Sequence, residues 1–186
     1  MVRNPRSGAV GYADGYVAGS DVSIDNPGGD GAESLFEWIH NLAGWRERQG
    51  MAGGEDNRDS ELLREWFDAT GAVVMGRMMY DTSQEFWGVK EGGTTFTFVT
   101  DGVHSALDQA KAAAGAKNVD IAGGASTVQQ YLREGLIEES RLHVVPALLG
   151  EGLRLFEGVG TGQRRVEQVR VVETPLATPL KYRFVR

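Results

Sequence analysis

The chain has 186 residues, of which 41% are hydrophobic and 24% charged, and its formal net charge is −7. This length and balance predict one globular domain, residues 1–186, with a sizeable core. The negative charge argues against a nucleic-acid-binding protein, and the absence of cysteine excludes disulfides, thiolate nucleophiles and cysteine-based metal centres.

The N-terminal segment, MVRNPRSGAVGYADG, contains basic residues but no apolar run of the kind found in signal peptides. No stretch of the sequence approaches the roughly 20 apolar residues that a membrane-spanning helix needs. We therefore expect a cytoplasmic protein. His40, His104 and His143 are far apart and lack metal-ligand spacing, so we expect no metal site.

Loops and helices alternate in the first part of the chain. Residues 17–30 are rich in Gly, Asp and Asn, which predicts a long loop. Apolar residues at helical spacing predict a first helix over 33–43, and a glycine-rich loop follows at 50–58. Asp59 or Ser60 can cap a second helix, whose expected apolar face consists of Leu62, Leu63, Trp66 and Phe67.

Strands and helices alternate in the remaining chain. The run AVVMG, 72–76, predicts a strand buried on both faces, and helical spacing begins at Arg77. Further strands are expected at 94–100, 119–122, 141–150, 166–173 and 180–185, and helices at 105–116 and 126–135. Pro146 indicates an edge or a bend in its strand. This order predicts an α/β fold with a largely parallel sheet and an antiparallel pair at the C-terminus.

Two predicted strands end in glycine immediately before a helix. Gly76 precedes Arg77, and Gly123-Gly124 precedes a helix that begins with Ser126 and Thr127. Glycine allows close approach of a ligand to the backbone, and a helix N-terminus attracts phosphate. Neither junction has the Rossmann or the Walker spacing, and each could be an ordinary turn. Two of them in one sheet favour a dinucleotide that contains pyrophosphate.

Four segments in order resemble the dihydrofolate-reductase-like family: DGYVAG (14–19), VVMGRMMYD (73–81), FTFVT (96–100) and IAGGAST with its continuation to residue 157. The resemblance is greatest to the branch that contains the reductase domain of bacterial riboflavin-biosynthesis deaminase-reductases. It implies a three-layer α/β/α fold with a central mixed, mostly parallel sheet, a C-terminal antiparallel hairpin, and NADPH bound across the carboxyl edge.

The resemblance also implies residue roles. The positions that match the cofactor-binding motifs are Gly76, Arg77, Thr100, Gly123, Gly124, Ala125, Ser126 and Thr127. Gly76 and Arg77 would hold phosphates, Thr100 would lie near the adenosine phosphate, and the glycine pair would lie against pyrophosphate and nicotinamide. In relatives this pair can form a cis peptide bond, and we expect one here.

The sequence departs from the riboflavin branch at two positions. Tyr16 stands where the S-L-D-G-basic motif has its basic residue, and Ala122 stands where an acidic residue precedes the glycine pair. Reduction of the riboflavin precursor is therefore open. The expected apolar first strand is also poor: either it is short, over residues 8–13, or the true start of the chain lies elsewhere.

Catalytic and substrate-binding residues are less well defined. Asp14 and Glu37 are candidates for acid–base roles, with Asp21 and Glu33 as neighbours that could serve instead, while exposed carboxylates are the ordinary alternative. Bulk water could equally supply the proton. Trp38 and Trp87 are candidates for the apolar wall of a substrate cleft, although buried aromatic residues mostly serve packing.

Three functions remain open at this point. The first is an NADPH-dependent reductase acting on a planar pyrimidine- or pterin-like heterocycle. The second is a module that binds NADPH without turnover, and the third is a structural homo-oligomer, with residues 141–150 as its interface. We expect a small-molecule substrate and neither a nucleic-acid nor a membrane partner, and a homodimer is compatible with the first two functions.

Overall fold

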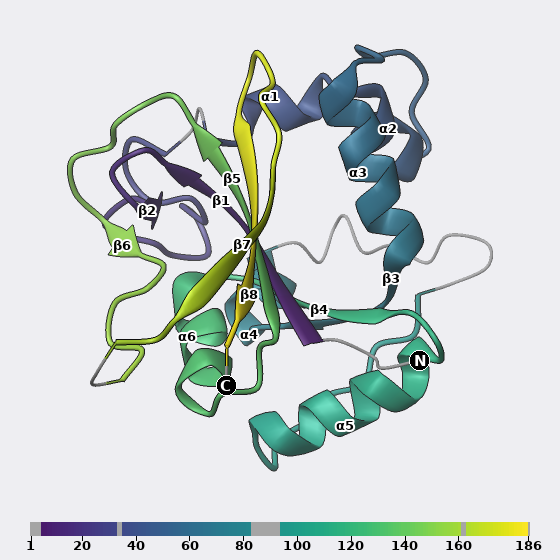
Figure 1. Cartoon of the computed structure of the whole chain (residues 1–186), viewed down its shortest axis with the longest axis vertical. Coiled ribbons are helices and arrows are strands. Elements are labelled where there is room, and N and C mark those ends of the chain that lie inside the picture. Colours follow the sequence, from purple (N-terminus) through teal and green to yellow (C-terminus); the bar gives the residue numbers. More distant parts are fainter. Residues whose placement is uncertain (1–4, 33–34, 83–93, 161–162, 186) are drawn as a thin grey trace.

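The fold was analysed in a computed structural model that describes residues 5–32, 35–82, 94–160 and 163–185. Its centre is a six-stranded sheet with the strand order β3-β4-β1-β5-β8-β7 (Figure 1). The strands are β1 (Pro5–Tyr12), β3 (Thr70–Met75), β4 (Asn118–Ala122), β5 (Glu139–Val145), β7 (Val166–Val171) and β8 (Thr178–Phe184). A small antiparallel pair, β2 (Tyr16–Ala18) and β6 (Leu153–Arg154), lies outside this sheet.

The direction of the strands confirms the predicted α/β architecture. β3, β4, β1 and β5 run parallel, whereas β8 is antiparallel to β5 and β7 is antiparallel to β8. The C-terminal hairpin is therefore present as expected. Parallel neighbours place the carboxyl ends of β3 and β4 at the same edge of the sheet, which is the edge where ligands of such folds usually bind.

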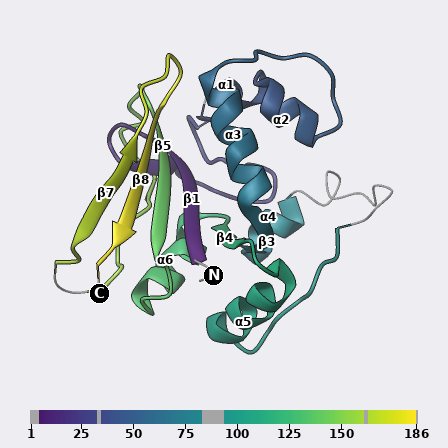
Figure 2. The same cartoon turned by 45° about the vertical axis from the view of Figure 1, so that its right-hand side comes forward.

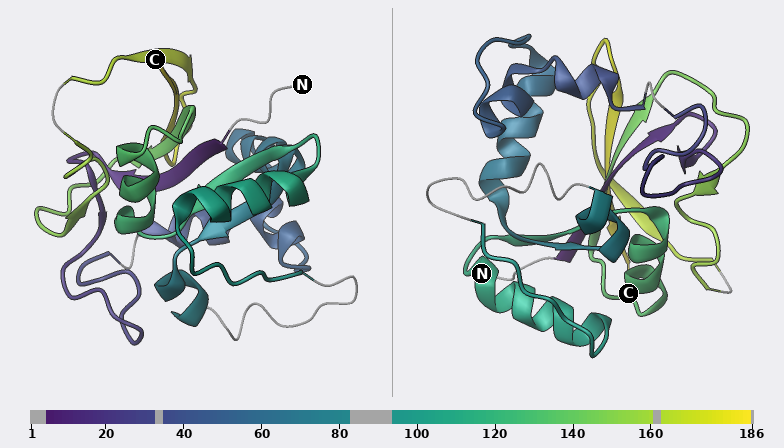
Figure 3. Two further views of the ribbon diagram at one scale, coloured as in Figure 1. Left: turned by 90° about the horizontal axis from the view of Figure 1, so that it is seen from below. Right: turned by 180° about the vertical axis from the view of Figure 1, so that it is seen from behind.

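Helices cover both faces of the sheet. They are α1 (Glu37–His40), α2 (Ala43–Arg48), α3 (Arg58–Ala69), α4 (Arg77–Thr82), α5 (Val103–Ala114) and α6 (Ala125–Arg133). α3 stands beside the sheet together with α1 and α2 (Figure 2). On the opposite face, α5 and α6 pack on β4 through a buried apolar cluster that includes Leu107, Val119, Ile121 and Val128 (Figure 3).

β1 is the largest departure from the sequence-based expectation. Instead of a short, poor strand at 8–13, it spans Pro5–Tyr12 and lies in the middle of the sheet between β4 and β5. Arg6 is only 6% exposed and forms an ion pair with Asp120. Gly8 allows Trp66 of α3 to pack on the strand, because a Cβ there would lie 2.7 Å from the indole ring. A buried charge pair and close packing thus replace the missing apolar residues.

Several helix predictions need correction. The first helix is not continuous over 33–43, because α1 ends at His40 and α2 begins at Ala43. α3 is capped by Asn57, whose side chain accepts a hydrogen bond from the backbone N–H of Ser60, rather than by Asp59 or Ser60. α6 begins after Gly124 without any side-chain cap, although Gly135 ends it with positive φ as expected.

The strand predictions were less accurate. Residues 94–100 form no strand, and Phe96 and Phe98 instead pack edge-on against Tyr80. β3 is not buried on both faces, because it is an edge strand and Val73 is 47% exposed. Pro146 lies in a bend directly after β5, so the predicted bend is confirmed, whereas the edge alternative is wrong because β5 is an interior strand. The expected cis peptide bond at Gly123-Gly124 is absent, as it is throughout the described residues.

Candidate functional site

The two strand-glycine-helix junctions lie side by side at the carboxyl edge of the sheet. Met75 of β3 is in register with Ala122 of β4, so Gly76 and Gly123 follow at neighbouring positions. A Cβ at Gly76 would overlap the hydroxyl oxygen of Thr127, and one at Gly123 would lie 3.1 Å from the backbone nitrogen of Gly76. Gly123 also has a φ of +110°, which favours glycine. Packing between the two junctions therefore explains both of these glycines.

Gly124 differs from its two neighbours. Its φ of −60° and ψ of 166° are accessible to any residue, and a Cβ added there would meet nothing within 4 Å. The protein's own packing therefore does not require glycine at this position. Gly124 is the N-cap of α6, and no side chain caps that end. The backbone N–H of Thr127 already donates to the backbone oxygen of Gly124, so the donors that this end offers to a ligand are the earlier N–H groups, those of Ala125 and Ser126.

The other predicted cofactor-binding residues make fewer contacts with the two glycine junctions. Arg77 begins α4 with its side chain 77% exposed and donates a 3.2 Å hydrogen bond to Asp81, one turn later. An exposed pair of this kind contributes little stability, so the guanidinium is available to an anionic ligand. Thr100 is exposed at the end of the irregular segment 94–100. Ala125, Ser126 and Thr127 form the first turn of α6.

Asp14 follows the carboxyl end of β1 and holds a neighbouring loop. Its Oδ2 atom accepts 2.9 Å hydrogen bonds from the backbone N–H groups of Leu149 and Gly150, while Oδ1 is buried and has no partner among the residues described. Burial raises the pKa of Asp14, but hydrogen bonds from backbone groups, those of Gly150 and Leu149 foremost, together outweigh burial and leave the pKa below its ordinary value. The side chain is therefore ionised at neutral pH.

Arg154 places a positive charge beside Tyr16, the residue that stands where the riboflavin branch has a basic side chain. Its guanidinium lies 4.2 Å from the centre of the Tyr16 ring and donates 3.0 Å to the phenolic oxygen. It also donates 2.9 Å to the backbone oxygen of Asp14. The pairing of β2 with β6 joins these distant segments. Sequence inspection missed Arg154 because no local pattern links two residues 138 positions apart.

The remaining candidates occupy different surroundings. Glu37 is exposed on α1. Trp38 is half-buried, donates from its indole nitrogen to the backbone oxygen of Leu35, and stacks on His143 with a centroid distance of 5.7 Å. Trp87 and Glu33 lie outside the described residues.

The family comparison tests the resemblance seen in the sequence. The family model described as the RibD C-terminal domain matches residues 89–176. The predicted resemblance to the riboflavin-type reductase domain is confirmed. The matched RibD-like segment includes the Gly123-Gly124 junction and Arg154, whereas Gly76, Arg77 and Asp14 precede it.

Solved structures share this RibD-like fold across the whole chain. A putative riboflavin biosynthesis protein from Shewanella sp. PV-4 superposes with a TM-score of 0.64 at 18% identity, covering 98% of this chain and 99% of that one. RibD from Acinetobacter baumannii gives a TM-score of 0.58 at 15% identity and covers 99% of this chain. The present chain spans 58% of that longer protein. These likenesses establish the fold.

Relatives detected by sequence carry no described activity. The uncharacterized protein YwjB of Bacillus subtilis (strain 168) is 26% identical over 159 residues, which cover 77% of this chain and 76% of that protein. YyaP from the same organism is 27% identical over 106 residues, or 50% of this chain and 56% of that protein.

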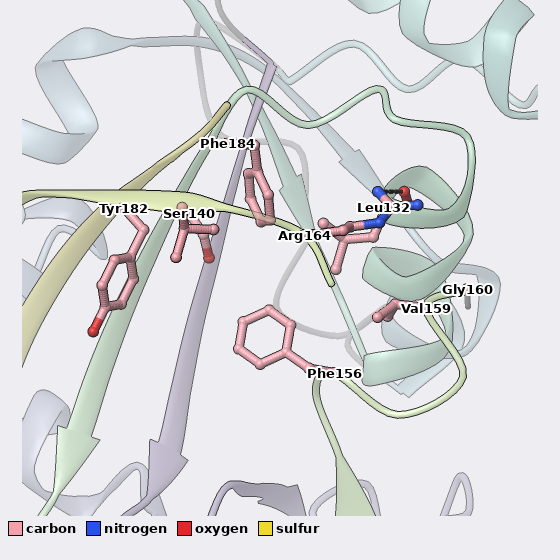
Figure 4. A pocket seen from close by; sticks show the side chains of 9 residues that line it. Leu132, Ser140, Phe156, Val159, Gly160, Arg164, Tyr182 and Phe184 are labelled. Carbon is pink, nitrogen blue, oxygen red and sulfur yellow. Dashed lines mark hydrogen bonds between the residues drawn. The ribbon is translucent and has the colours of Figure 1, made fainter. Parts of the chain in front are cut away.

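One pocket lies away from the glycine junctions. It has a volume of about 270 Å³ and lies between α6, β5 and β8, with Phe156, Tyr182 and Phe184 in its wall (Figure 4). Ser140, which also lines it, is near the amino end of β5. The guanidinium of Arg164 in this wall caps α6 by donating to the backbone oxygen of Leu132. We therefore assign the pocket no part in the candidate site at the glycine junctions.

Two other kinds of functional feature are missing from the described ranges. No group of histidine and carboxylate side chains there could hold a metal ion. No helix in the same ranges is long and apolar enough to cross a membrane.

Proposed function

We propose that this protein is an NADPH-dependent reductase that transfers hydride to a planar heterocycle of the pyrimidine or pterin type. The similarity to RibD reductase domains supports this class of reaction. One solved neighbour, from Thermotoga maritima, is described as a deaminase and 5-amino-6-(5-phosphoribosylamino)uracil reductase. A likeness at 11% identity establishes only the fold, so we take from that description a class of reaction to test.

Gly124 is the observation on which the proposal mainly rests. Gly76 and Gly123 are explained by contacts within the protein, whereas Gly124 faces space that a side chain would fill. A ligand that lies against the backbone at the start of α6 gives a reason for glycine there. The N–H groups of that helix turn suit a pyrophosphate, and Arg77 suits a further phosphate.

Bound NADPH would supply the hydride, and the side chains of the protein would position the reactants. Arg154, held over Tyr16, would meet an anionic group of the substrate close to the end of β1. The ionised Asp14 has no proton to give, so we assign it the role of holding the loop that contains Leu149 and Gly150. Under this proposal, solvent water supplies the proton.

Calorimetric titration with NADPH and NADH tests the cofactor assignment. We expect Gly124→Val to abolish NADPH binding while lowering the unfolding free energy by no more than about 1 kcal/mol, because the new side chain enters open space and only the N-cap preference for glycine over valine is lost. Gly28→Val is the matched control, since Gly28 has ordinary φ and its added Cβ would lie 3.7 Å from that of Ala32. Equal NADPH binding by both variants would refute the site.

Arg77→Ala tests the cofactor preference separately. Loss of a charge-assisted contact should weaken NADPH by roughly 1.5 to 3 kcal/mol and affect NADH much less. Equal weakening of both cofactors would contradict the phosphate role of Arg77. Binding of NADPH without its oxidation in the presence of pyrimidine, pterin or flavin-precursor substrates would favour the non-catalytic binding module.

A further inference from the structure

Three basic side chains form a row across the sheet beside α3. Arg141 of β5 is directly opposite Lys181 of β8, and Lys181 is opposite Arg170 of β7. All three line one small cavity, so they share a face. Like charges at opposed positions on neighbouring strands destabilise a sheet. This cationic row, Arg141, Lys181 and Arg170, therefore needs a compensating interaction.

Carboxylates compensate only part of the row. Arg170 pairs with Glu65 at 2.9 Å, and Lys181 pairs with Glu139 at 2.8 Å. The side chain of Arg141 has no hydrogen bond or ion pair within the described part of the chain, and its guanidinium lies 5.9 Å from the centre of the Trp66 ring. Burial lowers the pKa of Arg141, and the positive charges of Arg6 and Arg170 lower it further. The carboxylates of Glu65 and Asp120 raise this pKa but do not compensate for the lowering. The surroundings of Arg141 thus disfavour its charge.

His143 lines the same cavity and is also unsatisfied. It is 4% exposed, and its ring stacks on Trp38 and, with a centroid distance of 6.3 Å, on Trp66. Neither ring nitrogen has a hydrogen-bond partner among the residues described. Buried polar atoms are nearly always paired, so an unpaired imidazole that lines a cavity points to a ligand that is not part of the chain.

The size of the cavity limits what can enter it. Its volume is about 20 Å³, enough for one atom or group of the size of water. Arg170 and Lys181, whose side chains are 37% and 26% exposed, stand on its solvent side. A tetrahedral oxyanion could insert one oxygen toward His143 and keep its other oxygens between these two cations.

We propose that the cationic row and His143 form a binding site for a phosphate group, either free or carried by a small phosphate monoester. One oxygen accepts from Arg141 and from the imidazole N–H of His143, and Lys181 and Arg170 contact the outer oxygens. The site shares no residue with the glycine junctions, so it does not depend on the proposed cofactor site.

Phosphate titration followed by calorimetry and by NMR of the histidine rings tests this site. At constant ionic strength, inorganic phosphate should bind saturably, and the titration midpoint of His143 should rise by about one pH unit because a nearby anion favours the charged imidazole. Arg141→Met and the more exposed Arg170→Met should each weaken binding roughly tenfold or more. Arg183→Met removes the same charge from the same face outside the cavity and should change binding by less than about twofold.

Two results would overturn the proposal. One is non-saturable phosphate binding in the wild-type protein, and the other is equal binding by the wild-type protein, Arg170→Met and Arg183→Met. Parallel titrations with ribose 5-phosphate and with ribose distinguish free phosphate from a phosphate monoester, and ribose controls for binding of the sugar. If the monoester binds as well as inorganic phosphate, the outer oxygens of the bound phosphate are accessible from solvent. Simultaneous loss of NADPH and phosphate binding in well-folded Arg141→Met would contradict a separate site.

Discussion

Two charged clusters lie beneath α3 on the same face of the sheet, and they differ in how fully their polar atoms are paired. In the first, Asp120 accepts hydrogen bonds from Arg6, from Thr70 and from the indole nitrogen of Trp66, the last at 2.6 Å. In the second, Arg141 and His143 lack such partners within the described structure. Trp66 contacts both clusters.

This difference separates two uses of buried charge. A fully paired cluster stabilises one arrangement of strands, here by fixing β1 between β4 and β5. A buried cluster of polar groups without partners costs stability unless a ligand supplies the missing hydrogen bonds. Substitutions in the first cluster should therefore affect folding, whereas the second should respond to pH and to anions.

Asp120→Ala is expected to have the largest effect on stability. It leaves the guanidinium of Arg6, which is 6% exposed, without its carboxylate, and loss of one partner of a buried pair typically costs about 3–5 kcal/mol. Urea denaturation of the wild-type and variant proteins measures this loss.

The double variant Arg6→Met with Asp120→Leu provides the control. Removal of both charges leaves no unpaired ion, so this variant should recover much of the stability that Asp120→Ala loses. If Asp120→Ala changes the unfolding free energy by less than about 1 kcal/mol, the cluster is not a major determinant of the fold.

The sequence was sufficient to predict those parts of the fold that depend on local pattern. β4 and α6 have, respectively, a short apolar run and apolar residues at helical spacing, and both were located within one or two residues. β1 was underestimated because its central place depends on Arg6, which needs Asp120 from a segment 114 residues away. The strand predicted at 94–100 failed because β-propensity does not supply a pairing neighbour.

The candidate site shows the same division. The glycine junctions could be predicted, because glycine before a helix is a local pattern and parallel strands bring such ends together. Arg154 and the cationic row could not be predicted, since they depend on the pairing of β2 with β6 and on the register of the C-terminal hairpin. Pairing partners and register are set by contacts between distant segments, and composition does not reveal them.

His143 should make stability depend on pH in the second cluster. Burial and the charge of Arg141 lower its pKa from 6.5 to about 4, and the other cations that line its cavity are Arg170 and Lys181. The unfolded chain therefore binds the proton more tightly, so this contribution is complete above pH 6.5 and is lost as the pH falls toward 4. The loss should reach about 3 kcal/mol, because a tenfold change in proton affinity corresponds to about 1.4 kcal/mol.

Comparison with His143→Phe isolates this contribution. A phenyl ring can take the place of the imidazole against Trp38 and Trp66 but does not titrate. Urea denaturation at pH 7 and pH 4 should show a smaller loss of stability in the variant than in the wild-type protein. An identical loss in both proteins would show that His143 takes up no proton on unfolding in this range.

Arg183→Met should have the smallest effect. Its side chain is 54% exposed and lies 3.4 Å from Glu139, whose carboxylate also pairs with Lys181 at 2.8 Å. Because Glu139 keeps this closer partner, no buried charge is left unpaired, and the loss should fall within about 0–1 kcal/mol. A loss as large as that of Asp120→Ala in the same urea experiment would mean that charge alone, rather than burial and pairing, governs this face. The contrast between the paired and unpaired clusters would then have no energetic basis.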